Sequence, residues 1–295
     1  MTTSHSFGGR WTDKKLELVH KYLQAYTVIF DRNPKAQKLY TIYLDAFAGT
    51  GYRNSPASPG ENLLLEWGEE ETQTFLKGSA RIALEVEPPF KEYIFIENDP
   101  EYASELEHLR NVFLPSRPNI YIHNEKANPF LRPWLQRTNW RTTRAVVFLD
   151  PYGMQVDWKI IEAIGRTQAI DLWLLFPLGV AVNRLLTKSA PPPQKWADAL
   201  TRIFGTNEWQ QAFYPRKKQL TLFGEEEVQA KQADFESIGQ FFLQRLQGVF
   251  TAVAPNPFIL TNSKNNPLYW LYFASGNPIG APTAVKIARD ILGKG

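Results

Sequence analysis

Short apolar runs that alternate with amphipathic segments constrain the fold of this chain more than any other feature. Each run is rich in β-branched and aromatic residues, which is typical of a buried strand. Between the runs, apolar residues recur at the spacing of one helix face. Strands that alternate with helices across short connections indicate a parallel, doubly wound sheet. The five runs lie at residues 39–44, 93–96, 120–122, 145–149 and 172–176.

The two ends of the pattern differ from its middle. A helix is predicted before the first strand, with Thr12 as its cap and Asn33 as its end. After the fifth strand, a proline-rich loop at 189–193 leads into helical patterns, and strands resume at 258–260 and 268–273. We therefore predict an α/β, Rossmann-like sheet with helices on both faces and a helical insertion before the last two strands.

This pattern predicts that the chain is divided into three parts. They are the N-terminal helix with the first five strands (1–187), the helical insertion (188–251), and the last two strands with a C-terminal helix (252–295).

The composition limits the chemistry. The chain has 295 residues, of which 43% are hydrophobic and 21% charged, as in ordinary globular proteins. It has no cysteine, which excludes disulfides, iron–sulfur ligation and thiol catalysis, and its four histidines show no metal-ligand spacing, so no metal site is predicted. Lys and Arg number 33 against 30 Asp and Glu, a balance that permits an anionic partner. No apolar run approaches the roughly 18 residues of a membrane span. We expect a cytoplasmic protein with no membrane partner.

Polar or glycine-rich segments follow three of the predicted strands, at residues 45–51, 97–99 and 150–153. Ligands of open α/β sheets bind at the carboxyl ends of the strands, so these segments are expected to meet at one edge. Asp45 precedes Gly49 and Gly51, which allow a tight turn and close approach of a ligand. An acid before such a turn repels phosphate but suits a cationic group, such as the amino group of S-adenosylmethionine. The alternative is an ordinary strand-to-loop turn.

Glu97 ends the second strand. A carboxylate there can accept hydrogen bonds from both hydroxyls of a ribose. The alternative is that Glu97 caps the next helix, but Asp99 followed by Pro100 is already a strong helix start.

The segment Asp150-Pro151-Tyr152-Gly153 is the clearest indication of a reaction. It resembles the Asp/Asn-Pro-Pro-Tyr/Phe motif of amino-group methyltransferases, in which the acid accepts hydrogens from an amine and the aromatic ring stacks on a base. This chain has one proline and then Tyr-Gly, which departs from that motif. Asp150 and Tyr152 are the candidate catalytic residues, and Pro151 is a candidate substrate contact. The alternative is a turn that starts the next helix.

Taken together, motifs spread over the whole chain resemble the three-Cys-motif partner proteins, a bacterial family with a methyltransferase-like core. They lie at residues 7–12, 43–49, 95–100, 148–153, 183–186 and 269–274. The resemblance implies a class I methyltransferase sheet, S-adenosylmethionine as cofactor, and a partner that carries the three-Cys motif and resembles radical S-adenosylmethionine proteins. The family's Gly-Asp-x-Asn pattern is represented here by Asn128, with Lys126 at the acidic position. The cofactor residues implied are Asp45, Phe47, Gly49, Gly51, Glu97, Asp99, Asn128 and Asp150.

Two functions remain open. In the first, the protein is an S-adenosylmethionine-dependent methyltransferase that acts on an amino group of a nucleic-acid base. In the second, it is a non-catalytic, cofactor-binding module that serves the three-Cys-motif protein. In the first case Arg184 is expected to contact substrate, and Arg216, Lys217 and Lys218, in a loop of the insertion, are expected to contact phosphates. The alternative for the basic run is a solvated loop.

Overall fold

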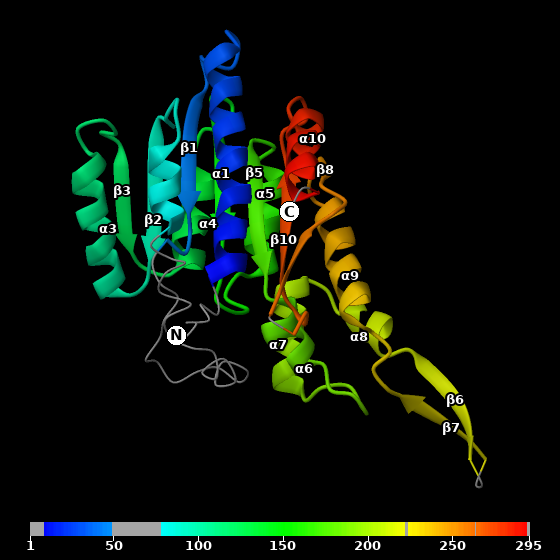
Figure 1. Cartoon of the computed structure of the whole chain (residues 1–295). Coiled ribbons are helices and arrows are strands. Elements are labelled where there is room, and N and C mark those ends of the chain that lie inside the picture. Colours follow the sequence, from blue (N-terminus) through cyan, green and yellow to red (C-terminus); the bar gives the residue numbers. More distant parts are fainter. Residues whose placement is uncertain (1–8, 49–77, 222–223, 263, 294–295) are drawn as a thin grey trace, which may run out of the picture.

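Eight strands form one mixed sheet in the described part of this computed structural model, which covers residues 9–48, 78–221, 224–262 and 264–293 (Figure 1). The strand order is β3-β2-β1-β4-β5-β10-β8, and β9 also pairs with β10. The strands are β1 (Tyr40–Asp45), β2 (Glu92–Glu97), β3 (Ile120–Asn124), β4 (Thr143–Leu149), β5 (Ile170–Phe176), β8 (Ala252–Val253), β9 (Phe258–Thr261) and β10 (Pro267–Ser275).

Strand direction completes the topology. Strands β3, β2, β1, β4 and β5 are parallel neighbours. Strand β10 is antiparallel to β5 on one side and to β8 and β9 on the other, so it is the reversed strand of the sheet. The fold is therefore the Rossmann-like class I methyltransferase sheet that the sequence predicts. Because β1 to β5 are parallel, their carboxyl ends all lie at one edge.

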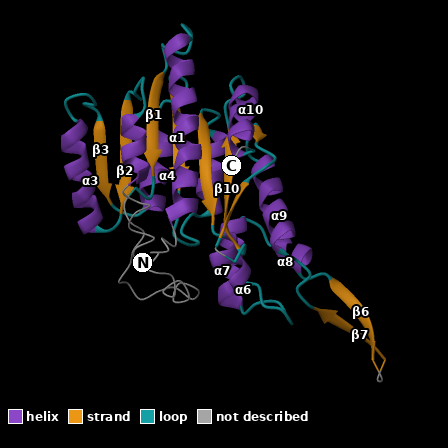
Figure 2. Ribbon diagram, viewed as in Figure 1, coloured by secondary structure: helices purple, strands orange, loops and turns teal. Residues whose placement is uncertain are grey.

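Helices cover both faces of the sheet (Figure 2). Successive side chains of a strand point to opposite faces, so Tyr43 belongs to one apolar cluster and Leu44 to the other. Tyr43 packs in the cluster of α1 (Gly9–Arg32), the helical residues 78–85, α3 (Pro100–Phe113) and α10 (Ala281–Leu292). The Leu44 face packs against α4 (Ala127–Arg137), α5 (Trp158–Arg166), α7 (Gln194–Phe204), α8 (Glu208–Phe213) and α9 (Phe235–Gln247).

Several predicted boundaries are confirmed. Asp99 is the N-cap of α3, its side chain accepts a hydrogen bond from the Glu101 amide, and Pro100 is the first helical residue. Gly205 ends α7 in the left-handed conformation, with φ of 69°, which glycine adopts without steric cost. The predicted cap at Thr12 is wrong. Helix α1 already begins at Gly9, which places Thr12 inside the helix, whereas a cap residue requires a non-helical backbone.

The segment between β5 and β8 is only partly helical, which corrects two predictions. It comprises the π-helix η2 (Leu178–Val182), the short α6 (Asn183–Leu185), α7, α8, a hairpin of β6 (Arg216–Thr221) and β7 (Gly224–Gln229), and α9. Arg216, Lys217 and Lys218 therefore lie in a strand, not in a loop. Strands β6 and β7 have few apolar residues, so they lack the alternation of apolar and polar residues that indicates a strand. Three strands, not two, follow the insertion, because the two-residue β8 was too short to recognise.

The helices of the insertion do not form a separate core. Phe204 of α7 and Phe242 of α9 both contact Phe176 of β5, with ring centroids 6.1 and 3.9 Å apart. Trp209 of α8 is fully buried in the same cluster. The apolar face of the insertion is thus continuous with one face of the sheet, and the hairpin β6–β7 projects from it (Figure 1).

Candidate functional site

Three buried carboxylates lie at the carboxyl ends of β1, β2 and β4, on the same face of the sheet. Asp45 ends β1, Glu97 ends β2, and Asp150 directly follows β4. Each comes two residues after a side chain of the apolar cluster that contains α1, namely Tyr43, Phe95 or Phe148. Because the side chains of a strand alternate between the two faces of the sheet, all three carboxylates lie on the face that α1 covers. Asp45 is also in register with Phe95 of β2 and Phe148 of β4. The predicted convergence of these strand ends is confirmed.

Asp45 is fully buried and incompletely hydrogen-bonded. Its Oδ1 accepts a hydrogen bond from the Phe47 amide over 3.1 Å, and the Ser79 side chain also bonds to the carboxyl group. Its Oδ2 has no hydrogen-bond partner among the described residues. The pKa of Asp45 is raised to about 7, chiefly by burial; the Phe47 amide opposes the increase and the nearby Asp150 adds to it. A buried acceptor without a donor fits the amino group of a cofactor such as S-adenosylmethionine.

Glu97 and Asp99 form the end of β2. The Asp99 amide donates a hydrogen bond to Glu97 Oε1 over 2.6 Å, and the Asn124 side chain donates one to the Glu97 carbonyl. The Glu97 carboxylate has about four acceptor sites and is the kind of group that can accept a hydrogen bond from a ribose hydroxyl. The Asp99 carboxylate itself caps α3.

Asp150 is held by a lysine from the first helix. Lys15 Nζ lies 2.8 Å from Asp150 Oδ2, and the two side chains are 0% and 5% exposed. The ammonium group also lies 5.8 Å from the centre of the Phe148 ring. Burial lowers the pKa of Lys15 to about 8, although Asp150 and Asp45 both raise it. Among the described residues, the site therefore combines three buried carboxylates with one buried lysine, an excess of acids that favours a further positive charge.

Two tyrosines and an arginine lie beside this ion pair. The hydroxyl of Tyr269, in β10, donates a hydrogen bond of 3.4 Å to the Tyr152 carbonyl. Burial raises the pKa of Tyr269 far above its usual value, Asp150 and Tyr152 add to the increase, and Arg184 opposes it. Tyr152 is half-buried, and burial raises its pKa as well. Asp150, Tyr152 and Arg184 thus all lie within electrostatic reach of Tyr269.

The loop after β4 is tied to α4. The Asn128 side chain donates a hydrogen bond of 2.8 Å to the Gln155 carbonyl, and the Gln155 side chain accepts one from the Tyr152 amide. Asn128 Oδ1 is buried without a partner among the described residues. Pro151 is buried within this loop. Asn128 thus supports the loop that carries Pro151 and Tyr152.

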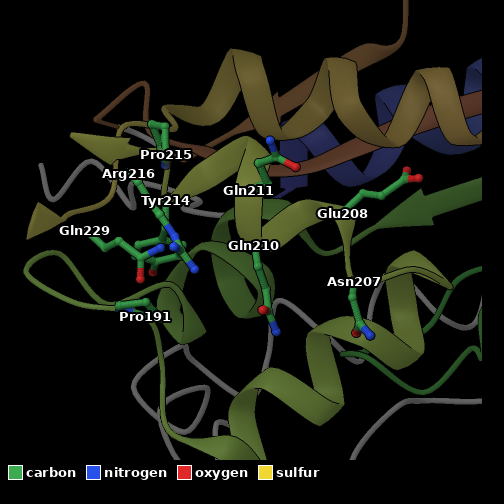
Figure 3. A pocket seen from close by; sticks show the side chains of 9 residues that line it. All are labelled: Pro191, Asn207, Glu208, Gln210, Gln211, Tyr214, Pro215, Arg216 and Gln229. Atoms are coloured by element: carbon green, nitrogen blue, oxygen red, sulfur yellow. The ribbon is translucent and has the colours of Figure 1, made fainter. Parts of the chain in front are cut away.

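The remaining candidates lie apart or outside the described residues. Phe47 is half-buried against the core, whereas Gly49 and Gly51 lie outside the residues that the structure describes. Arg216 lines a separate cleft of about 660 Å³ in the insertion, together with Pro191, Asn207 and Gln229. Figure 3 shows Arg216 and Gln229 side by side on one wall and Asn207 at the other end. None of the strand-end carboxylates lines this cleft.

The base of the hairpin reaches back toward the carboxyl edge. The Lys231 ammonium, just after β7, donates a hydrogen bond to the side chain of Asn183, the residue before Arg184. The Lys231 amide also bonds to the Lys188 carbonyl over 3.0 Å. The chain that leaves the hairpin after β7 is therefore held near Arg184, whereas the hairpin itself projects away from the sheet (Figure 1).

Sequence reasoning missed Lys15 and the role of Tyr269. A signal for Lys15 was present: it stands three residues before Leu18 and seven before Tyr22, both buried, so it continues the apolar stripe of α1. A lysine on such a stripe requires a buried acid. Tyr269 lies in an apolar run, where nothing distinguishes its hydroxyl from a satisfied core group.

Within the described ranges, no three His, Cys, Asp or Glu side chains are grouped so that they could hold a metal ion. Nor does any helix of those ranges have the length and hydropathy needed to cross a membrane.

Comparison with known proteins yields only distant similarities. No protein-family model and no curated protein matches the chain. The chain is similar to the solved structure of protein LPL1258 from Legionella pneumophila, with 13% identity over 98% of this chain and 92% of the other, at a TM-score of 0.44.

Two solved methyltransferases are more distant in structure. The putative methyltransferase yhhF from Escherichia coli has 12% identity over 65% of this chain and 77% of its own, with a TM-score of 0.27. The magnesium protoporphyrin IX methyltransferase of Synechocystis, solved with bound S-adenosylmethionine, has 9% identity over 75% and 82%, with a TM-score of 0.31. The fold assignment rests on the strand order and direction of the sheet, not on these similarities.

Proposed function

We propose that this protein binds S-adenosylmethionine and transfers its methyl group to an amino group. The observation that carries the proposal is the buried Asp45 carboxylate, whose Oδ2 has no hydrogen-bond partner among the described residues, at the carboxyl edge of a methyltransferase-type sheet. Asp45 accepts hydrogen bonds from the cofactor's amino group, and Glu97 accepts them from the ribose hydroxyls.

The cofactor supplies an electrophilic methyl group on a positively charged sulfur. Asp150 would accept a hydrogen bond from the substrate amine through Oδ1, which directs the nitrogen lone pair toward that methyl group. As the nitrogen–carbon bond forms, the sulfur–carbon bond would break with its electron pair left on sulfur, and Asp150 would take the proton that the nitrogen loses. Lys15 holds Oδ2 and favours the ionised form of Asp150. Tyr152 contacts the plane of the substrate, and Arg184 lies beside it.

The amine that fits this arrangement best is the exocyclic amino group of a nucleic-acid base. An amine of this kind is attached to a flat ring, which an aromatic side chain such as Tyr152 can stack on. The hairpin that carries Arg216, Lys217 and Lys218 is followed by Lys231, whose ammonium bonds to the side chain of Asn183, the residue before Arg184. In the proposal these cations contact phosphates and position the strand without reading its sequence.

Calorimetry with S-adenosylhomocysteine on cofactor-free protein tests the binding step. We expect a dissociation constant below millimolar. Glu97→Ala should make the binding free energy less favourable by about 1.5–3 kcal/mol, as expected for the loss of a hydrogen bond to a charged group. Glu105→Ala, at an exposed position on α3, is the matched control and should bind as the wild type does. Binding weaker than millimolar to both S-adenosylmethionine and its product would refute the proposal.

Transfer of radiolabelled methyl groups to DNA, RNA and protein tests the reaction. Asp150→Ala should abolish transfer in protein that still binds S-adenosylhomocysteine, because Asp45 and Glu97 bind the cofactor; the retained binding shows that this variant, which loses a buried ion pair, is folded. Equal transfer by wild type and Asp150→Ala would refute the role of Asp150.

A second candidate is the non-catalytic module that serves a three-Cys-motif protein of the bacterial cytoplasm. The Lys15–Asp150 ion pair favours it, since it occupies one oxygen of the carboxylate on which the enzyme mechanism depends. Tight cofactor binding without transfer to any acceptor, together with co-elution with the three-Cys-motif protein in size-exclusion chromatography, would support the module.

A further inference from the structure

A second cavity opens at the opposite edge of the sheet. It has a volume of about 270 Å³ and lies between the C-terminal half of α1, the first residues of β4 and β5, and the start of α10. Arg144, the second residue of β4, lines it, whereas Asp150 follows the other end of that strand. Six residues of strand separate the two by about 20 Å. The cavity is therefore distinct from the candidate active site.

The exposed part of the cavity is lined by apolar side chains together with Asn33, Asn277 and Thr283. Ile279, in the turn before α10, is 91% exposed, and Ile29 of α1 is 38% exposed. Phe30 of α1 and Ile287 of α10 complete this wall. Aliphatic and aromatic groups gathered around a hollow are typical of ligand sites, where they bury the apolar part of a small molecule.

The inner wall holds polar groups that the protein leaves unsatisfied. Tyr26 is 7% exposed, and its hydroxyl has no hydrogen-bond partner in the described ranges. The same holds for Arg144 Nε, although Arg144 Nη1 donates to the carbonyls of Trp140 and Thr143. Leaving a buried polar atom without a partner is costly, and such atoms are few in native proteins. A ligand that hydrogen-bonds to both would remove this cost.

The charges that face the cavity balance. Asp171, in β5, lines it together with the cationic Arg144 of the neighbouring strand β4, and its two oxygens accept hydrogen bonds from Tyr22 and Ser275 over 2.6 and 2.5 Å. Each oxygen of Asp171 thus already has a partner within the protein, and the negative charge of Asp171 offsets the positive charge of Arg144. A ligand with a net charge of either sign would meet one repulsive partner.

We propose that this cavity binds a small, uncharged aromatic molecule that carries a hydrogen-bond acceptor such as a carboxamide. The ring lies against Phe30, which already stacks on Tyr26 with centroids 4.5 Å apart, and the acceptor meets the Tyr26 hydroxyl and Arg144 Nε. The volume is just below the range of sites for drug-sized ligands, which limits the occupant to one ring system with its substituent.

Calorimetry and saturation-transfer NMR with the full chain test the proposal, with benzamide as the probe. Benzoate and benzylamine test the requirement for neutrality, and cyclohexanecarboxamide tests the aromatic ring. We expect benzamide to bind at least about threefold more tightly than each of these, which corresponds to one hydrogen bond or ring contact. Absence of benzamide binding below about 10 mM would overturn the proposal.

Two variants locate the binding. Tyr26→Phe removes only the unpartnered hydroxyl, so benzamide affinity should fall about 3- to 10-fold while thermal stability stays the same or rises. Tyr121→Phe, at an exposed position on β3, is the control and should change neither. Ala284 of α10 also lines the cavity, so Ala284→Phe places a ring in it and should abolish binding in a protein whose circular dichroism is unchanged. Equal benzamide affinity in wild type and Tyr26→Phe would overturn the proposal, whether or not Ala284→Phe folds.

Discussion

Replacing Lys15 by methionine should destabilise the protein far more than any exposed lysine change on the same helix. The two atoms of the Lys15–Asp150 pair are 2.8 Å apart, and neither side chain is exposed enough for water to replace its partner. Removal of one partner from a buried ion pair costs about 3–5 kcal/mol of unfolding free energy, because the other charge stays buried. Lys21→Met is the matched control, since Lys21 pairs with Glu17 at the surface and should contribute less than about 1 kcal/mol.

The double variant Lys15→Met/Asp150→Asn distinguishes the stability lost with the contact itself from the stability lost because a charge stays buried without a partner. Replacing both partners by uncharged residues of similar volume leaves no buried charge, so its stability should lie nearer the wild type than either single variant. The loss in Lys15→Met should also shrink at low pH, because Lys15 lowers the pKa of Asp150 and without it the carboxyl group takes up a proton more readily.

Urea unfolding followed by tryptophan fluorescence and circular dichroism measures these differences as shifts in the midpoint. A Lys15→Met midpoint equal to that of Lys21→Met would contradict the buried ion pair. So would a double variant whose loss equals the sum of the two single losses, because independent sites are additive and coupled ones are not.

Four further predictions concern cofactor affinity, the pH dependence of stability, the packing and the hairpin. Because burial raises the pKa of Asp45 to about 7, this group is protonated as the pH drops below 7. The affinity for S-adenosylhomocysteine, measured by calorimetry, should then fall by up to about tenfold per pH unit. Asp45→Asn should not show this pH dependence. Stability from the same group should instead decrease as pH rises from about 4 to 7, because the folded protein holds the proton more tightly than the unfolded chain. Gly239→Ala should lower the melting temperature by the equivalent of about 1–3 kcal/mol, because its Cβ would lie 2.2 Å from the Trp270 ring, whereas Gly153→Ala meets no atom within 4 Å and should not. Replacing residues 216–218 by alanine should weaken binding of unrelated nucleic acids alike and flatten its salt dependence, and an unchanged slope would remove the hairpin from the substrate path.

The sequence predicts the parts of this protein that depend on local pattern. The strands before Asp45, Glu97 and Asp150 were identified from apolar runs, and parallel topology then brought their ends together. Lys15 depends on a contact across 135 residues, which no local periodicity contains. The hairpin was missed because the charged residues of β6 and β7 do not alternate with apolar ones.

The late position of β10 in the sequence has a consequence for biosynthesis. All seven residues of β5 are buried, and one of its edges pairs only with β10. Residues 177–266 lie between the two strands in the chain. At about 5–20 residues per second, the ribosome needs roughly 5–18 s to make them. During that interval the growing chain carries an apolar strand with one unpaired edge, which can pair with neighbouring chains. Polypeptides that stop before residue 267 would keep this edge open, and they should aggregate even though the five parallel strands are complete.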